Sequence, residues 1–203
     1  ALVQHRATGV EFKVAIFSNI SHDHLDYHKT FQNYLDAKKM LFDQLSADSY
    51  ALVNNDDFHS EYMTQNCKAK IERYALKTSA EFKGKVVENQ FSGLHLQIDG
   101  QDVWTKIIGR FNAYNILSVY GTAMLLGEEK MNVLTGISRL STVAGRFQYI
   151  KTEEGTTGVV DYAHTPDALK NVLETIRDIR TGNEQVITVI GCGGDRDTTK
   201  RPD

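Results

Sequence analysis

The segment from Ser18 to Lys38 constrains this chain more than any other part of its sequence. It gathers three histidines and two aspartates within seven residues: His22, Asp23, His24, Asp26 and His28. Apolar residues then recur at helical spacing from Phe31 to Leu45, and Lys38 falls on the same stripe. A lysine on the buried face of a helix costs free energy unless its amine reaches solvent or its charge is cancelled. The segment therefore predicts a helix with a metal and phosphate site at its start.

Simpler interpretations of this segment stay open. Histidines near a helix start are often surface or capping groups, and an inward lysine often extends its amine to solvent. Zinc fits poorly because neither Cys67 nor Cys192 is nearby, whereas carboxylates suit magnesium or manganese. The residues alone leave the presence of a metal undecided.

Composition and length exclude several classes of protein. The chain has 203 residues, 41% hydrophobic and 24% charged, as in one large or two small globular domains. A net charge of -3 without a basic run argues against nucleic acid as the main partner. We expect no membrane span and no signal peptide, and the two distant cysteines indicate a reducing, cytoplasmic setting. Because the chain lacks a starting methionine and ends just after a glycine-rich loop, we expect it to be an internal piece of a longer protein.

The expected elements are those of an α/β fold in two parts, residues 1–142 and 143–203. In the first part we expect strands at 13–18 and 50–53, an antiparallel β segment at 69–108, and helices at 31–45, 109–126 and 131–140. The Asp99-Gly100 pair between alternating segments predicts a hairpin. In the second part we expect a βαβ unit with a strand at 157–160, a helix at 167–180 and a buried strand at 185–190.

Two further features suggest ligand contacts. Asn112 and Asn115 share a face at the first turn of the helix 109–126, where they could contact a base edge or simply cap the helix. The glycines of 191–194 follow a predicted strand and would let backbone N–H groups approach an anion. No Gly-x-x-x-x-Gly-Lys-Ser/Thr occurs, so if ATP is used, its main phosphate cradle is expected outside these residues.

Five segments, in order and spacing, resemble the motifs of the Mur ligases. They are SNISHDHLDYH at 18–28, GRFNAYN at 109–115, GRF at 145–147, VDYAHTPD at 160–167 and GCGGDRD at 191–197. The resemblance is strongest to the branch that adds the third residue of the muramoyl peptide. It implies an incomplete P-loop-type central domain followed by the start of a Rossmann-like C-terminal domain. It further implies ATP-dependent ligation of lysine or meso-diaminopimelate to UDP-MurNAc-L-Ala-D-Glu through an acyl phosphate.

Position by position, the resemblance also implies roles. His24 and Lys38, the latter carbamylated, would be catalytic and hold Mg²⁺, because a carbamate turns the cation into a carboxylate-like group. Gln4 and Arg6 would contact the muramoyl peptide. The implied nucleotide-binding residues are Asn112, Asn115, Arg146, Asp161 and His164, and the implied active-site loop contains Asp195 and Arg196. Lys29 departs from the family, where a glycine is common.

The same resemblance implies a monomer that binds ATP, the UDP-linked dipeptide and a free amino acid. Without a P-loop, the 203 residues alone are expected to be inactive. Other amide ligases of the superfamily, such as folylpolyglutamate or cyanophycin synthetase, and a non-catalytic nucleotide-binding module are the alternatives. The DYAHTPD string at 161–167 and the spacing of Gln4 and Arg6 favour the muramoyl-peptide enzyme. These residues do not determine which third amino acid is added.

Overall fold

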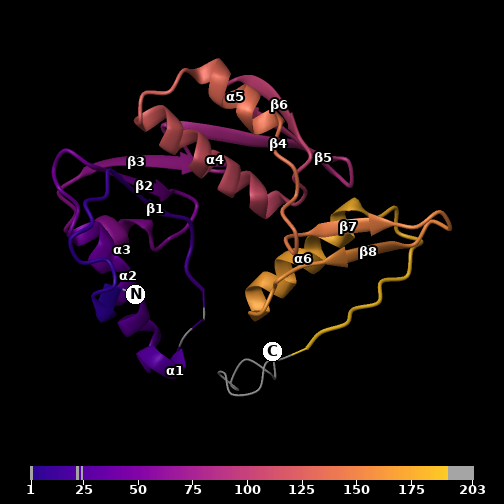
Figure 1. Cartoon of the computed structure of the whole chain (residues 1–203), viewed down its shortest axis with the longest axis horizontal. Helices are drawn as coiled ribbons and strands as arrows, with labels where there is room; N and C mark the ends of the chain where they lie inside the picture. Colours follow the sequence, from indigo (N-terminus) through magenta and orange to yellow (C-terminus); the bar gives the residue numbers. More distant parts are fainter. Residues whose placement is uncertain (1, 22, 24, 192–203) are drawn as a thin grey trace.

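The computed structural model describes residues 2–21, 23 and 25–191, which form two regions (Figure 1). We call residues 2–142 the first region and residues 143–191 the second region. The elements of the first region are η1 (Leu2–Gln4), β1 (Val14–Phe17), α1 (Leu25–His28), α2 (Phe31–Asp43), β2 (Tyr50–Asn54), α3 (Ser60–Thr64), β3 (Lys70–Ala75), β4 (Phe82–Gln90), β5 (Gly93–Ile98), β6 (Gln101–Thr105), α4 (Arg110–Leu125) and α5 (Lys130–Ser138). Those of the second region are β7 (Gln148–Lys151), β8 (Thr157–Val160) and α6 (Pro166–Ile179).

A mixed six-stranded sheet with the order β1-β2-β3-β4-β5-β6 forms the centre of the first region. The strands β1 to β4 pair in parallel, and β4, β5 and β6 pair antiparallel. The expected hairpin is confirmed, since Asp99 and Gly100 have φ of 44° and 80° and join β5 to β6. The antiparallel prediction for 69–108 is wrong for β3, because the chain crosses over through α3 and returns parallel to β2.

Helices cover both faces of this sheet, α4 and α5 on one and α2 and α3 on the other (Figure 1). Both faces need a cover because successive side chains of β2 point to opposite faces of the sheet and reach the helix layer on each side. Leu52 packs with Leu117 of α4, whereas Val53 packs in the cluster that contains Phe42 of α2. No helix in the described part of the chain has the length and apolar character needed to cross a bilayer.

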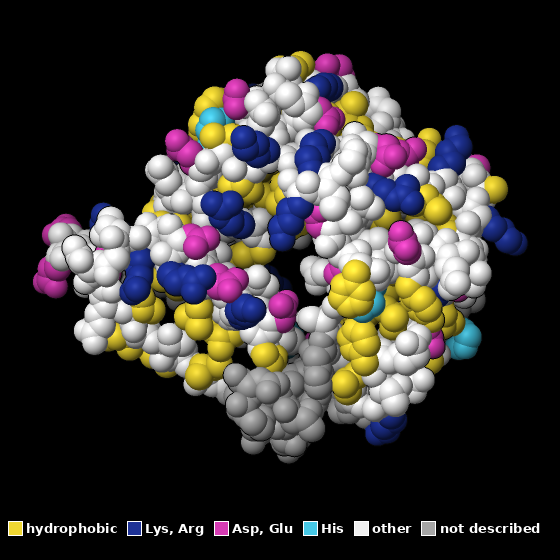
Figure 2. Space-filling view, turned by 180° about the vertical axis from the view of Figure 1, so that it is seen from behind, with side chains coloured by type: hydrophobic (Ala, Val, Ile, Leu, Met, Phe, Trp, Pro, Cys, Tyr) yellow, Lys and Arg dark blue, Asp and Glu magenta, His cyan; other side chains and the backbone are white. Residues whose placement is uncertain are grey.

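The second region is smaller and more exposed, and it differs from the expected βαβ unit. The strand β8 pairs antiparallel with β7, and the described residues 185–190 form no strand. The predicted buried strand there is wrong: Ile187 is 79% exposed and Val189 is 93% exposed. An apolar run with β propensity still needs a hydrogen-bonded neighbour, and no described strand pairs with this one. Figure 2 shows hydrophobic side chains on the surface of this region, at the left.

Candidate functional site

A cavity of about 500 Å³ lies between the two regions, and the molecular surface is hollowed between them in Figure 2. Its lining combines the segment after β1, the start of α4 and the segment from β8 into α6. The sequence-predicted residues that line it are Asn112, Asn115, Arg146, Asp161 and His164. The structure thus brings together all five residues for which the resemblance implied a nucleotide contact. Asn19 and Ser21 of the histidine-rich segment line the same cavity.

One wall is the first turn of α4, which begins after Gly109. Gly109 has φ of +97°, and a Cβ there would lie 2.7 Å from the Phe111 ring, so the position requires glycine. Asn112 Nδ2 donates to the carbonyl oxygen of Ile108 at 2.7 Å, and Asn115 Nδ2 donates to Asn112 Oδ1 at 3.0 Å. Both bonds are donated by the amide nitrogens, and no side chain accepts from a backbone N–H at the N-cap of α4, so the expected N-terminal capping by these asparagines is not observed. Both amides keep unused hydrogen-bonding capacity at the cavity wall.

The opposite wall is organised by Asp161. Its Oδ2 accepts from the backbone N–H of Phe147 and its Oδ1 from that of Ala163, both at 2.7 Å. Phe147 has φ of +45° and is fully buried, so these bonds help to hold a backbone conformation that L residues rarely adopt. Asp161 acts here as a structural acceptor, and each oxygen retains a second lone pair toward the cavity.

A cation and an aromatic ring stand beside Asp161. The guanidinium carbon of Arg146 lies 4.9 Å from the centre of the Tyr162 ring, a cation–π arrangement. His164 contacts the same ring at 5.1 Å between ring centres, and its Nδ1 lies 3.0 Å from the Tyr162 carbonyl oxygen. Sequence reasoning missed Tyr162, although its place between Asp161 and His164 in one motif was a signal.

Sequence reasoning also missed Asp56, which follows β2. Its carboxylate accepts hydrogen bonds from the backbone N–H groups of Leu76, Lys77 and Thr78, each at 2.8 Å. The hydroxyl of Tyr114 on α4 donates to the same carboxylate at 3.0 Å. Burial alone would raise the pKa of Asp56, but the hydrogen bonds outweigh it and lower the pKa from 3.8 to about 2. Its position just after a strand, within a cluster of Asn and Asp residues, was the available signal.

The prediction that Lys38 lies on the buried face of α2 is wrong. Lys38 is exposed, and its Nζ lies 5.3 Å from the centre of the Tyr34 ring. The buried lysine is Lys39, 6% exposed, which pairs with Asp43 one turn later. Because successive helical residues are 100° apart, a stripe read from spacing alone does not fix which of two adjacent lysines points inward.

Lys38 nevertheless lies near the histidine-rich segment. The His28 and Tyr34 rings are 5.3 Å apart, and burial together with the nearby charge of Asp23 raises the pKa of Tyr34. Lys29 has φ of +67°, a conformation that favours the glycine common in the family.

The metal interpretation stays a prediction. His24, Asp195 and Arg196 lie outside the described residues. Within the residues that are described, no three His, Cys, Asp or Glu side chains gather as a metal site. The described donors therefore do not complete a magnesium site by themselves.

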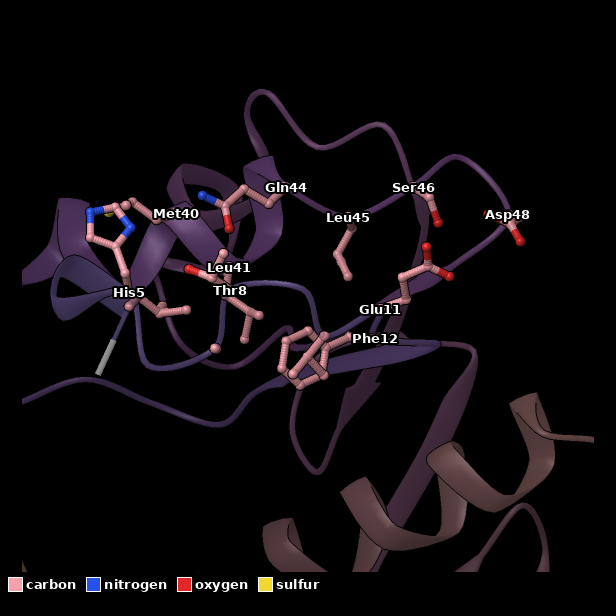
Figure 3. Close-up of a pocket in the computed structure, with 13 residues that line it drawn as sticks. His5, Thr8, Glu11, Phe12, Met40, Leu41, Gln44, Leu45, Ser46 and Asp48 are labelled. Carbon is pink, nitrogen blue, oxygen red and sulfur yellow. The ribbon is translucent and has the colours of Figure 1, made fainter.

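Gln4 and Arg6 are exposed and do not line the cavity between the regions. They flank His5, which lines a second cavity of about 450 Å³ next to the C-terminal half of α2 (Figure 3). In Figure 3 its wall includes Phe12 from the approach to β1 and Gln44 from the end of α2. None of the predicted site residues lines this second cavity.

A mixed sheet covered by helices forms the first region, and a cavity with both polar and apolar lining residues lies between it and a smaller second region. These features define a two-part α/β protein with a site between its parts. Profiles of two protein families match this chain, one described as the Mur ligase middle domain over residues 1–123 and the other as the Mur ligase, glutamate ligase domain over residues 145–203. The chain belongs to the Mur ligase family.

Relatives and solved structures agree with this assignment. The chain is 52% identical over 202 residues to UDP-N-acetylmuramoyl-L-alanyl-D-glutamate--2,6-diaminopimelate ligase of Cytophaga hutchinsonii, matching all of this chain and 41% of the relative. A solved structure of a ligase with the same name is 34% identical with a TM-score of 0.73, covering 99% of this chain and 42% of the other. A MurF structure from Acinetobacter baumannii, 17% identical, shares the fold with a TM-score of 0.75 over 83% of this chain and 38% of the other. The chain thus spans about two fifths of the length of the curated relatives it matches.

Proposed function

We propose that this chain provides the nucleotide-facing part of a Mur ligase that adds the third amino acid to UDP-MurNAc-L-Ala-D-Glu with ATP. The observation that carries the proposal is the gathering of Asn112, Asn115, Arg146, Asp161 and His164 around one cavity. The names of the relatives specify 2,6-diaminopimelate, so we propose meso-diaminopimelate in preference to lysine.

The proposed reaction requires the protein to align the substrates, and it does not require a protein nucleophile. The dipeptide carboxylate attacks the γ-phosphate of ATP, ADP leaves, and an acyl phosphate forms. The incoming amine then displaces phosphate and loses a proton to form the amide. In this proposal the Asn112 and Asn115 amides contact the adenine edge, and Arg146 with Asp161 contacts the ribose side. His164 lies toward the phosphates. These contacts fix the nucleotide so that attack is in line.

We propose that Mg²⁺ is held by His24 and by a carbamate on Lys38 and that it neutralises the crowded phosphate charge. The exposure of the Lys38 amine supports this role, because dissolved carbon dioxide can reach it, whereas Lys39 is buried and paired with Asp43.

We further propose that residues 1–142 and 143–203 are two domains of the ligase. Gln4 and Arg6 would contact the muramoyl peptide, and Asp195 and Arg196 would belong to a loop that faces the active site. A monomer in the cytoplasm is the proposed form of the enzyme, and the 203 residues alone are expected to lack ligase activity because they contain no P-loop sequence.

The test uses a full-length Mur ligase that contains these 203 residues. Phosphate release should require ATP, UDP-MurNAc-L-Ala-D-Glu and diaminopimelate together. Lys38→Ala should lower turnover by about a hundredfold or more, since the metal's charge stabilisation would be lost, and short carboxylic acids should restore part of it. Lys70→Ala is the matched control, because Lys70 is also exposed and its Nζ lies 5.6 Å from the centre of the Tyr50 ring, yet the proposal gives Lys70 no metal or substrate contact.

The control should leave turnover unchanged. Phosphate release that does not depend on the dipeptide substrate would exclude the proposed activity. Unchanged turnover of Lys38→Ala would remove Lys38 from the proposed mechanism.

A further inference from the structure

The end of β2 and the turn that follows it bind two elements that contribute to the cavity lining, the segment after β1 and α4. Asn54 Nδ2 donates to the carbonyl oxygen of Ser18 at 2.8 Å, just before the cavity residue Asn19. Asn54 Oδ1 accepts from the backbone N–H of Asp56 at 3.1 Å, which orders the turn itself. Asp56 in turn accepts the hydroxyl hydrogen of Tyr114 on α4. One short turn therefore connects the segment after β1 with the helix that carries Asn112 and Asn115.

The Asp56 carboxylate is a fixed point for this contact. The three consecutive backbone N–H groups of 76–78 and the Thr78 hydroxyl all donate to it, so its oxygens cannot rotate freely. It lies at the carboxyl ends of β2 and β3, both of which belong to the central sheet. A carboxylate held in this way fixes any side chain that binds to it.

Tyr114 transmits that fixed position to the cavity wall. It lies between Asn112 and Asn115 in the first two turns of α4, where the three side chains move together when the helix rotates about its axis. The backbone N–H of Gly109 donates to Asn89 Oδ1 at 3.0 Å, which fixes the point where the helix begins. With its start held by Asn89, the rotation of the first turn is set by the Tyr114 contact.

We infer that Asp56, acting through Tyr114, is a positioning residue that sets the orientation of the Asn112–Asn115 amide pair toward the nucleotide. This inference rests on the proposed nucleotide role of that pair. Asp56 itself does not line the cavity, so the proposed effect on the asparagine pair reaches the nucleotide through α4.

The same helix offers a matched control. Tyr120 on α4 donates its hydroxyl to Asp99 Oδ2 at 2.8 Å, and that carboxylate is also held by a backbone N–H, from Lys83 at 3.0 Å. The Tyr120 contact joins α4 to the β5–β6 turn and not to the cavity. Tyr114→Phe and Tyr120→Phe each remove one hydroxyl from an equivalent bond, but only the first lies beside the asparagines.

The experiment measures KM for ATP, kcat and Tm in a full-length Mur ligase that contains these residues. Tyr114→Phe should raise KM for ATP by about three- to tenfold, the size expected for one lost hydrogen bond, and leave kcat within about twofold. Asp56→Asn should act in the same direction. Tyr120→Phe should lower Tm by a similar amount as Tyr114→Phe while KM for ATP stays within about twofold of the parent.

Three results overturn the inference. If Tyr114→Phe and Tyr120→Phe change KM for ATP equally, the Asp56–Tyr114 contact stabilises the fold but does not position the asparagine pair. An unchanged KM in Tyr114→Phe, with a raised KM in Asn112→Ala and Asn115→Ala, would reject the positioning role and leave the proposed function intact. If the asparagine variants themselves keep the parental KM for ATP, the proposed nucleotide site fails, and the positioning role fails with it.

Discussion

The two regions of this protein bury their side chains to different degrees. In the first region Leu52, Tyr74 and Leu117 are completely buried, because the sheet carries helices on both faces. In the second region β7 and β8 form a sheet of their own, and Ile150 and Val160 on them are 60% and 51% exposed. The first region therefore contains its own hydrophobic core, whereas the described part of the second region buries little apolar surface by itself.

The buried apolar side chains of the second region share one hydrophobic cluster with residues of the first region. Phe147 and Val172 form a cluster with Ile108, which directly precedes the first turn of α4, and Phe111 packs against that cluster. The cavity lies along the same contact, since Phe111 and Val172 also line it. Because the two regions differ in burial, we infer that the cavity depends on the packing between them. This packing is weaker than the hydrophobic core on either face of the central sheet.

The largest expected effect tests this dependence directly. Phe147→Ala should destabilise the packing of the second region by about 3–5 kcal/mol, because a fully buried aromatic side chain is removed from its only described cluster. Hydrogen exchange should become faster in β7, β8 and α6 and stay slow in β2 to β5. Leu117→Ala, in the core of the first region, should instead accelerate exchange throughout the sheet. Uniform acceleration in Phe147→Ala would mean that the regions unfold as one unit.

A smaller effect is expected at the wall of the cavity. Asp161→Asn should cost about 1–3 kcal/mol, because an amide nitrogen would replace one of the two oxygens that accept from Phe147 and Ala163. Denaturant titration monitored in the second region would measure the loss. Asp167→Asn is a suitable control, since Asp167 is exposed and lines the same cavity. If Asp161→Asn lowers the free energy of unfolding no more than Asp167→Asn does, the structural role of Asp161 is contradicted.

The smallest expected effect concerns acid stability. The folded pKa of Asp56 is about 2, below its ordinary value of 3.8, so its ionised form stabilises the first region above about pH 4. That stability, about 1 kcal/mol after allowance for solvent screening, should be lost as the pH falls from about 4 toward 2. In Asp56→Asn the free energy of unfolding should depend less on pH in this window. The pKa of Glu184 in the second region is also lowered, but Glu184 is exposed and solvent weakens its interactions, so Glu184→Gln should change the pH dependence of unfolding less than Asp56→Asn does.

Local patterns predicted the four longer helices, α2, α4, α5 and α6, but not the short helices α1 and α3. The apolar spacing from Phe31 places α2, and Thr30 caps it by accepting from the backbone N–H of Asn33 at 3.1 Å. The Asp99-Gly100 turn was equally predictable, because few residues adopt positive φ at both turn positions. The partners of a strand were not predictable in this way. The direction of β3 depends on a crossover through α3, and the run 185–190 has β propensity without a described neighbour.

The sequence by itself determined the family, the four longer helices, the hairpin turn and the residue types of the proposed nucleotide site. Those properties follow from local spacing and from motifs, which are present whatever the rest of the chain does. Only the tertiary structure decided that Lys39 and not Lys38 is buried, that Asp56 binds Tyr114, and that the five predicted nucleotide residues share one cavity. Each of these depends on which elements pack together, and packing is set by contacts between residues far apart in the chain.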